Sequence, residues 1–358
     1  MPGSAMSTPA RPPFGHLLVV NGLLDTPHRA RIAPYFIDIT LVPLGKAPND
    51  AQLGEAEVVY GLPLGEWFTS AAQVPKLRLI QLISAGSDRV VRSPLWKDEE
   101  SKHIQVATGS GVHTGPIPQH FIMTTLALFH KLQEQILISQ VEKRWGTNDD
   151  MGSMGFIREL RGKTVGILGY GHIGREAARL AAAFGATIIA ANTSGKRTPQ
   201  DGYIVPGTGD PTGIIPATWY STKDDASLAA FLGASDVILL ALPSTLATRH
   251  ILNAHTLAHV RSHAVIVNVG RGDAIDTDAL VAVLDEGRLG GAALDVVEPE
   301  PLPAGHTLYG RKNVIITPHM SGRTERYNDI AVDIFTENLE RLKKGQELLN
   351  TVDPRRGY

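Results

Sequence analysis

Short apolar runs alternate along the chain with segments in which apolar residues recur at helical spacing. Continuous apolar runs of this length, each ending at Gly, Pro or a polar turn, are typical of strands buried on both faces of a parallel sheet. They fall into two series. The predicted strands are 16–22, 37–43, 56–61 and 77–84, followed by 164–171, 186–192, 235–243, 263–270, 291–297 and 313–319. The pattern therefore predicts an α/β fold with two parallel sheets.

Two longer segments have the spacing of helices. Residues 116–140 lie between the two series and predict one long helix. Residues 324–345 place Ile330, Ile334 and Leu342 on one helical face and end at a glycine, which is a common helix stop. We expect this last helix to pack back on the first unit.

Composition limits the function classes. The 358 residues are 43% hydrophobic, which is enough for two cores, and the net charge of −2 gives no basis for a nucleic-acid partner. No cysteine is present, which excludes disulfides, thiolate metal sites and cysteine nucleophiles, and we expect a cytoplasmic protein without a bound metal. Residues 1–14 predict a disordered tail, and polar residues interrupt the apolar region 121–138, so we expect no membrane association.

Residues 198–225, inside the second series, are dense in Gly and Pro. A long stretch of this composition predicts a surface excursion rather than a strand or helix.

The stretch GILGYGHIG, residues 166–174, joins a predicted strand to a predicted helix. Its G-x-G-x-x-G spacing within a βαβ unit is typical of a Rossmann dinucleotide site, although glycine turns also have purely structural uses. Gly169 would permit the tight turn, Gly171 would let the backbone approach a pyrophosphate, and Gly174 would let helix and strand pack closely. The free N–H groups at the helix start would hold the phosphates. The predicted contacts are Gly169, Tyr170, Gly171, His172, Ile173 and Gly174.

The end of the next predicted strand indicates which nucleotide binds. Sites for NAD usually have an acid about 20 residues after the turn, on the ribose 2′-OH. Here the strand ends in AANTSGKR, residues 190–197, and no acid lies between Glu176 and Asp201. NADP(H) is therefore favoured, with NAD(H) as the alternative. The residues predicted to hold a 2′-phosphate are Thr193, Ser194, Lys196 and Arg197. In the alternative interpretation the two cations are ordinary solvated loop charges.

Charged residues also follow the later predicted strands, at the sheet edge where open α/β sheets bind ligands. Arg271 lies between two glycines and carries a fork suited to a carboxylate. Asp295, Glu298 and Glu300 follow the next strand, and His319 follows the one after. Two of them also have a purely structural interpretation. The arginine could form a structural salt bridge, and the histidine could be an ordinary hydrogen-bonded residue of the core or surface. Their occurrence at successive strand ends favours a catalytic site.

With these motifs in place, the sequence closely resembles the D-isomer-specific 2-hydroxyacid dehydrogenases. The resemblance runs from about residue 16 to 345. The motifs that carry it, in order, are LISAGSDRV (82–90), GILGYGHIG, LLALPSTLATRHIL (239–252), VNVGRGDAIDTDAL (267–280), GRLGGAALDVVEPEPLP (287–303) and NVIITPHMSG (313–322). The resemblance implies NAD(P)H-dependent reduction of a small 2-keto acid, such as glyoxylate or hydroxypyruvate, to the D-2-hydroxy acid, and the reverse reaction.

The resemblance also implies residue roles. Arg271 would bind the substrate carboxylate, His319 would be the acid/base, and Glu300 would pair with it, with Glu298 as the competing candidate. Asp295 would face the nicotinamide. The implied further cofactor contacts are Leu242, Pro243, Thr248, Val269, Asp295 and Gly322. The implied substrate contacts are Leu62, Ala85, Gly86 and Arg271.

The family's architecture implies a split substrate domain, residues 15–118 with 324–358, and a dinucleotide domain, residues 119–323, with the active site in the interdomain cleft. It also implies a homodimer built through the nucleotide domain. Two other functions stay open. Formate dehydrogenases resemble this motif set but carry an amide where Glu300 stands. The C-terminal-binding corepressors resemble it as nucleotide-sensing binding proteins and retain the same three charged groups.

Overall fold

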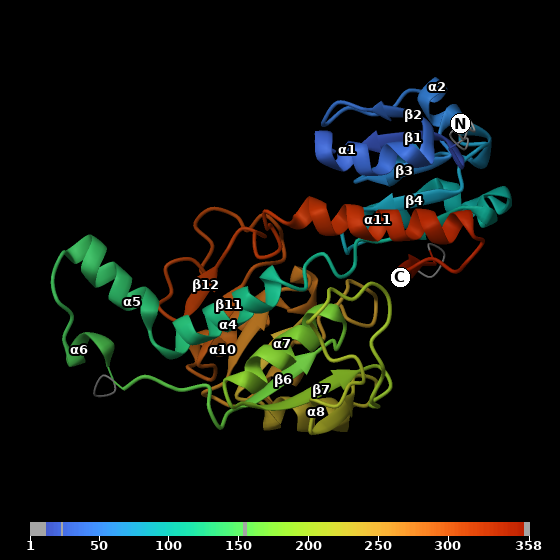
Figure 1. Cartoon of the computed structure of the whole chain (residues 1–358). Coiled ribbons are helices and arrows are strands. Elements are labelled where there is room, and N and C mark those ends of the chain that lie inside the picture. Colours follow the sequence, from blue (N-terminus) through green and yellow to red (C-terminus); the bar gives the residue numbers. More distant parts are fainter. Residues whose placement is uncertain (1–11, 23, 153–155, 354–358) are drawn as a thin grey trace, which may run out of the picture. The chain divides into compact units, whose positions relative to one another are not determined.

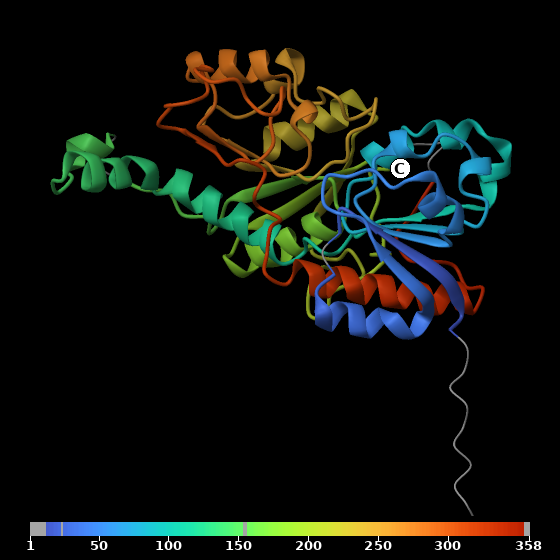
Figure 2. The same cartoon turned by 90° about the horizontal axis from the view of Figure 1, so that it is seen from above.

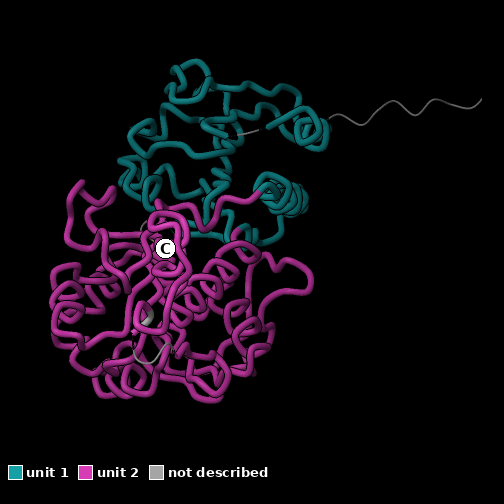
Figure 3. The backbone as a smooth tube through the Cα atoms, turned by 90° about the vertical axis from the view of Figure 1, so that its left-hand side faces the viewer, with its two compact units in different colours: residues 1–112, 325–358 teal, residues 113–324 magenta. Residues whose placement is uncertain are grey.

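The computed structural model describes residues 12–22, 24–152 and 156–353, and the chain forms two compact units (Figures 1 and 3). Unit 1 contains residues 1–112 and 325–358, and unit 2 contains residues 113–324. The chain thus leaves unit 1 and returns to it at residue 325. The boundary expected at residues 118 and 119 falls inside a helix, α4, that belongs wholly to unit 2.

Unit 1 is built on a six-stranded sheet of order β13-β5-β4-β3-β1-β2. Its strands pair in parallel except β13, which is antiparallel to β5. The strands are β1 (Phe14–Val20), β2 (Phe36–Leu41), β3 (Val58–Gly61), β4 (Leu79–Leu82), β5 (Gln105–Ala107) and β13 (Thr351–Val352). The four predicted strands are confirmed. The sequence pattern missed β5 and β13, because elements of two or three residues are too short to show a period.

The predicted tail ends too late. Residues 1–11 lie outside the described residues, but Phe14 opens β1 and is buried, with its ring centroid 5.6 Å from that of Phe36. An aromatic pair in the core fixes this position as part of the sheet.

The helices of unit 1 are α1 (Thr26–Ile32), α2 (Asp50–Glu55), α3 (Asp88–Val91) and α11 (Tyr327–Lys343). Helix α11, red in Figure 2, lies beside the blue α1. Its Phe335 stacks on Tyr60 with ring centroids 4.5 Å apart, and Asn338 donates to the Gln81 side chain at 2.8 Å. The prediction that the last helix packs back on the first unit is therefore confirmed.

Unit 2 is built on a seven-stranded, fully parallel sheet of order β12-β11-β10-β9-β6-β7-β8. Its strands are β6 (Thr164–Leu168), β7 (Thr187–Asn192), β8 (Thr218–Ser221), β9 (Val237–Leu240), β10 (Val265–Asn268), β11 (Gly291–Leu294) and β12 (Val314–Ile316). Its helices are α4 (Pro116–Phe129), α5 (Leu132–Leu137), α6 (Asn148–Met151), α7 (His172–Ala183), α8 (Asp225–Ala234), α9 (Ala254–Leu257) and α10 (Thr277–Asp285). Apolar clusters fill both faces of the sheet, which is why its strands read as continuous apolar runs.

Two expectations for unit 2 are corrected. The helix expected over 116–140 is broken, because α4 ends at Phe129 and Lys131 adopts a left-handed backbone (φ 52°) before α5 begins. The excursion expected over 198–225 contains β8, which pairs with β7. That strand lies at the sheet edge and is only half-buried, so its sequence lacks the apolar signal. No helix in the described part of the chain is long and apolar enough to cross a membrane.

Candidate active site

The predicted catalytic and cofactor residues all belong to unit 2, where they follow the carboxyl ends of its parallel strands. The glycine turn follows β6, the cationic turn follows β7, and the later charged residues follow β10, β11 and β12. Parallel strands end at one edge of their sheet, so the fold brings these segments to one edge. Three predicted substrate residues belong instead to unit 1, where Leu62 follows β3 and Ala85 and Gly86 follow β4.

Close packing accounts for two of the three motif glycines. Gly169 has φ 99°, and a Cβ there would lie 2.6 Å from the Ala241 carbonyl oxygen. A Cβ on Gly174 would lie 2.3 Å from the Gly169 oxygen. A Cβ on Gly171, in contrast, would meet no heavy atom within 4 Å. Gly171 is also the N-cap of α7, and no side chain caps that helix start. Open space in front of uncapped amides is what a bound pyrophosphate requires.

The turn after β7 is organised by Asn192. Its Oδ1 accepts from the amides of Ser194 and Gly195, at 3.1 and 2.8 Å, and its Nδ2 donates to the Lys196 carbonyl at 2.8 Å. Gly195 completes the turn with φ 65°. The side chains of Lys196 and Arg197 are exposed. The turn thus presents two cations at the strand end where a nucleotide ribose binds in Rossmann folds.

Backbone packing around two glycines fixes the loop that carries Arg271. A Cβ on Gly270 would lie 2.7 Å from the Leu242 oxygen, and one on Gly272 would lie 1.9 Å from the Val297 oxygen. Within the loop, the fully buried Asn268 accepts from the Gly270 amide at 3.1 Å and donates to the Arg271 carbonyl at 2.9 Å. Sequence reasoning missed Asn268, because a single Asn at a strand end gives no signal of its loop contacts.

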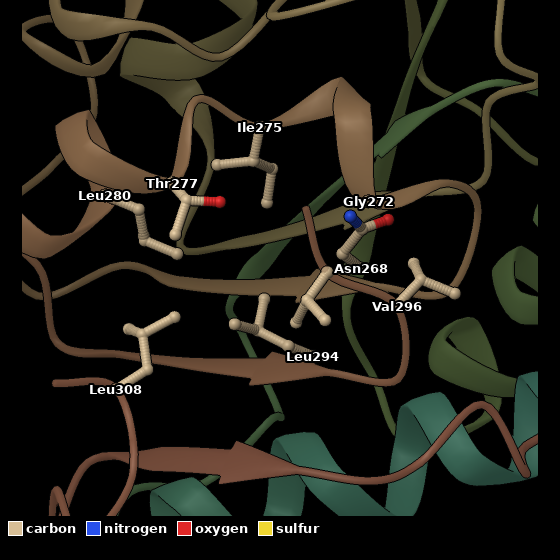
Figure 4. Close-up of a pocket in the computed structure, with 9 residues that line it drawn as sticks. Asn268, Gly272, Ile275, Thr277, Leu280, Leu294, Val296 and Leu308 are labelled. Atoms are coloured by element: carbon tan, nitrogen blue, oxygen red, sulfur yellow. The ribbon is translucent and has the colours of Figure 1, made fainter. Parts of the chain in front are cut away.

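The core beneath this loop leaves little open space. Figure 4 shows the side chains that line a small cavity there, contributed by β10, β11, α10 and the connecting loops. The cavity measures about 10 Å³, which is too small to hold more than a single water. It is therefore part of the packed support of the Arg271 loop rather than a substrate pocket.

The structure brings together His319 and Glu300, with 2.7 Å between Nδ1 and Oε1. Glu298, the competing candidate, bonds instead to His250 Nε2 at 2.8 Å and to Arg249 at 2.7 Å. These contacts hold the pKa of Glu298 below its ordinary value, with the His250 bond as the main cause. Within unit 2, Glu300 is thus the carboxylate available to orient the His319 ring.

Asp295 is buried and fixes the segment that carries His319. Its carboxylate accepts from the Thr317 hydroxyl at 2.6 Å, the Met320 amide at 3.0 Å, and both the amide and the hydroxyl of Ser321. Its carbonyl accepts from the His319 amide at 3.0 Å. Burial alone would raise the pKa of Asp295, but the bonds from Ser321, Thr317 and the two amides hold it below its ordinary value. The contact with the nicotinamide expected for Asp295 stays a prediction.

His113 is a site residue that the sequence did not reveal. Its Nδ1 lies 3.2 Å from the Gly322 carbonyl oxygen, to which it donates. Burial lowers the pKa of His113 to about 4, against the bond to Gly322, which raises it, and the electrostatic influence of Arg271 and His319 adds smaller lowering contributions. The side chain is therefore neutral at pH 7. The sequence contains 13 histidines, and nothing in the local pattern separates this one from the others.

Comparisons with known proteins show the family to which the chain is similar. The family model described as D-isomer specific 2-hydroxyacid dehydrogenase, NAD binding domain, matches residues 122–207 and 213–321. A glyoxylate reductase of Aeropyrum pernix is 31% identical over 79% of this chain and 78% of its own length. Glyoxylate/hydroxypyruvate reductase A of Arabidopsis thaliana is 31% identical over 78% of this chain and 80% of its own.

A solved structure from Xanthobacter autotrophicus Py2 has the same fold. It is described as a D-isomer specific 2-hydroxyacid dehydrogenase in complex with NADPH and MES. The TM-score is 0.74 and the identity 24%, with 96% of this chain and all of that chain covered.

Proposed function

The chain belongs to the D-isomer-specific 2-hydroxyacid dehydrogenases, which are NAD(P)-dependent oxidoreductases, and from this premise we propose that it reduces a small 2-keto acid to the D-2-hydroxy acid. The observation that carries the proposal is the 2.7 Å contact between His319 and Glu300 at the sheet edge to which Arg271 also belongs. An imidazole paired with a carboxylate supplies a proton near neutral pH, and a guanidinium fork binds a carboxylate.

Each residue has a defined task in this reaction. A bound nicotinamide supplies the hydride for the carbonyl carbon. Arg271 binds the substrate carboxylate and orients the keto group. His319, whose Nδ1 is held by Glu300, donates a proton from Nε2 to the keto oxygen, and Glu300 stabilises the imidazolium form. In the reverse direction His319 accepts the hydroxyl proton.

The residues present fit a dinucleotide. Gly171 leaves open space in front of the uncapped amides of α7, which suits a pyrophosphate. We infer a preference for NADP(H), because the turn after β7 carries Lys196 and Arg197 and no acid that would repel a 2′-phosphate. The contacts from Leu242, Pro243, Thr248, Val269 and Gly322 remain part of this proposal.

The substrate contacts in unit 1 are proposed for Leu62, Ala85 and Gly86. The loop after β4 is ordered by its own bonds, since the Ser84 hydroxyl donates to the Gly86 carbonyl at 2.8 Å. Leu62 is fixed by its amide, which donates to the Val20 carbonyl at 2.9 Å. Glyoxylate and hydroxypyruvate are the substrates we propose first, because two relatives are named as reductases of these acids.

A homodimer through unit 2 is also proposed. Residues 132–145 and 156–157 expose large apolar side chains, with Trp145 94% and Val141 69% exposed. Clustered exposed apolar residues on a globular unit mark an interaction surface. Sedimentation velocity should give twice the chain mass, and Val141→Asp should shift the protein to the monomer. A wild-type chain that sediments as a monomer contradicts the dimer.

The test of function is turnover with a panel of 2-keto acids: glyoxylate, hydroxypyruvate, pyruvate and phenylpyruvate. We expect oxidation of NADPH and a product of D configuration wherever the product is chiral. Formate with NADP⁺ is the control for the formate reaction, which the carboxylate of Glu300 disfavours. Nucleotide binding without turnover of any of these acids would instead support the nucleotide-sensing protein.

A further inference from the structure

Three charged side chains are buried where the loop between β7 and β8 meets helix α7. Arg175, Glu176 and Asp210 are 3%, 4% and 3% exposed. Residues 198–217 are called here the excursion loop. Burying a charge costs several kcal/mol unless it is paired or hydrogen-bonded. A loop that moved away from these three side chains would leave their charges buried without partners, so their contacts hold the loop in one position.

Arg175 joins the start of the excursion loop to a later part of the same loop. Its Nη2 donates to the carbonyls of Thr198 and Pro199, at 2.9 and 3.0 Å, and to the Thr198 hydroxyl. Its Nη1 donates to the Asp210 carbonyl at 2.8 Å. The rigid guanidinium thus bonds to two separate stretches of backbone within the loop. Its neighbour Glu176 adds a further contact by accepting from the Gly209 amide at 2.7 Å.

Asp210 ties the same loop to the glycine turn. Its carboxylate accepts from the Tyr170 hydroxyl at 2.8 Å and from the amides of Ile214 and Ile215. Tyr170 lies between the first two glycines of the motif. Burial and the bond to Asp210 raise the pKa of Tyr170, so its hydroxyl stays a donor. The excursion loop and the phosphate-binding turn therefore share one buried network.

The stem of Arg197 packs against this network. A Cβ on Gly213 would lie 3.0 Å from Arg197 Cγ and 3.5 Å from Arg175 Nη1. The Gly213 amide donates to the Asp210 carbonyl at 3.1 Å, so Gly213 is itself held in the anchored loop. The side chain of Arg197 therefore runs between the turn after β7 and a loop whose position depends on Arg175.

We propose that Arg175 is a positioning residue for nucleotide selectivity: through the excursion loop it holds Arg197 where the 2′-phosphate of NADP(H) binds. The inference rests on the proposed preference for NADP(H). We place Arg175 behind the nucleotide site rather than in it, because it is buried and both of its Nη atoms donate to backbone carbonyls of the excursion loop. With this role for Arg175, the excursion loop takes part in nucleotide binding.

The experiment measures binding of NADPH and of NADH to the full chain by titration calorimetry. Arg175→Gln removes the charge and the fork. We expect the Kd for NADPH to rise about tenfold, while the Kd for NADH changes by less than about twofold. Arg175→Lys keeps a buried cation with fewer bonds and should raise the Kd for NADPH, but by less than about tenfold; it is the test variant if Arg175→Gln does not fold. Arg288→Gln is the matched control, because Arg288 is a partly exposed arginine of the same unit that pairs with Glu286.

A double-mutant cycle separates positioning from general stabilisation. If Arg175 acts through Arg197, then Arg175→Gln combined with Arg197→Ala should bind NADPH as weakly as Arg197→Ala alone. Additive losses, an equal loss for NADPH and NADH, or unchanged binding of both would overturn the positioning role. A wild-type protein that binds the two nucleotides equally would refute the proposed preference and this inference with it. A wild-type preference that Arg175→Gln retains would refute this inference alone.

Discussion

A substitution at Asp295 tests how the segment that carries His319 is held in place. Asp295→Asn keeps the shape of the side chain but places an N–H₂ group where one carboxylate oxygen accepts. Oδ1 accepts from the Thr317 hydroxyl and the Met320 amide, Oδ2 accepts from the Ser321 hydroxyl, and the Ser321 amide is shared between the two oxygens. The variant therefore leaves one or two buried donors unsatisfied whichever oxygen is replaced. Each such donor costs about 1–3 kcal/mol. We expect the segment that carries His319 to lose about 2–4 kcal/mol of local stability.

Hydrogen exchange reads this loss directly, because the Met320 and Ser321 amides donate to Asp295. A loss of about 2–4 kcal/mol corresponds to exchange at least about 30-fold faster at these amides. Asp285→Asn is the control, since Asp285 is an exposed carboxylate paired with Arg311. Exchange at Met320 and Ser321 within about threefold of the wild type would refute the anchoring role.

The hydrogen bonds to Asp295 also predict that the stability of this segment depends on pH. The pKa of Asp295 in the folded chain lies below its ordinary value. The ionised Asp295 side chain therefore contributes fully to stability above the ordinary carboxyl pKa. That contribution is lost as the pH falls through the lower pKa that Asp295 has in the folded chain. In wild type the Met320 and Ser321 amides should therefore lose protection from hydrogen exchange at acid pH, and in Asp295→Asn this pH dependence should disappear. If the variant keeps the wild-type pH profile, another group is responsible.

Two further predictions concern the loops at the site. Gly272→Ala would place a Cβ 1.9 Å from the Val297 oxygen, so the loop must move, and we expect the KM for the keto acid to rise about tenfold or more. Gly54→Ala, where a Cβ meets nothing within 4 Å, is the steady-state control, and an unchanged KM in Gly272→Ala contradicts the packing argument. The folded pKa of His113 is lowered to about 4, so wild-type stability should fall from pH 6.5 to 4 by at most about 1.4 kcal/mol per pH unit. Denaturation of His113→Gln should show a smaller fall, and an equal fall would assign it to other groups.

The sequence predicts those parts of the fold that have a periodic or compositional signal. Buried parallel strands such as β6 and β10 appear as apolar runs, and α11 appears through its spaced Ile and Leu residues. Strand β8 escaped prediction because an edge strand is buried on one side only, and its sequence TWYS lies in a Gly- and Pro-rich region. The break after α4 depends on the left-handed Lys131, which no helix propensity reveals.

The candidate site divides in the same way. The residues proposed to contact a ligand belong to motifs, so Gly171, Arg271 and His319 could be named from the sequence. Residues that hold them, such as Asn268, His113 and Arg175, act through contacts with backbone that lies elsewhere in the chain. The contact of Arg175 with Thr198 spans 23 residues, and that of His113 with Gly322 spans 209. Such contacts are set by tertiary structure, and single-sequence patterns do not contain them.

In the proposed reaction, His319 transfers the proton to the keto oxygen of a 2-keto acid. The direct measurement compares NADPH oxidation by the wild type and by His319→Asn with hydroxypyruvate at saturating nucleotide. Asparagine tolerates the left-handed backbone of residue 319 (φ 53°), so the loop should be retained. We predict turnover by the wild type and a rate at least about 100-fold lower in the variant, with the Kd for NADPH within about twofold. Near-wild-type turnover in His319→Asn, or no turnover of any 2-keto acid by the wild type, would contradict the account.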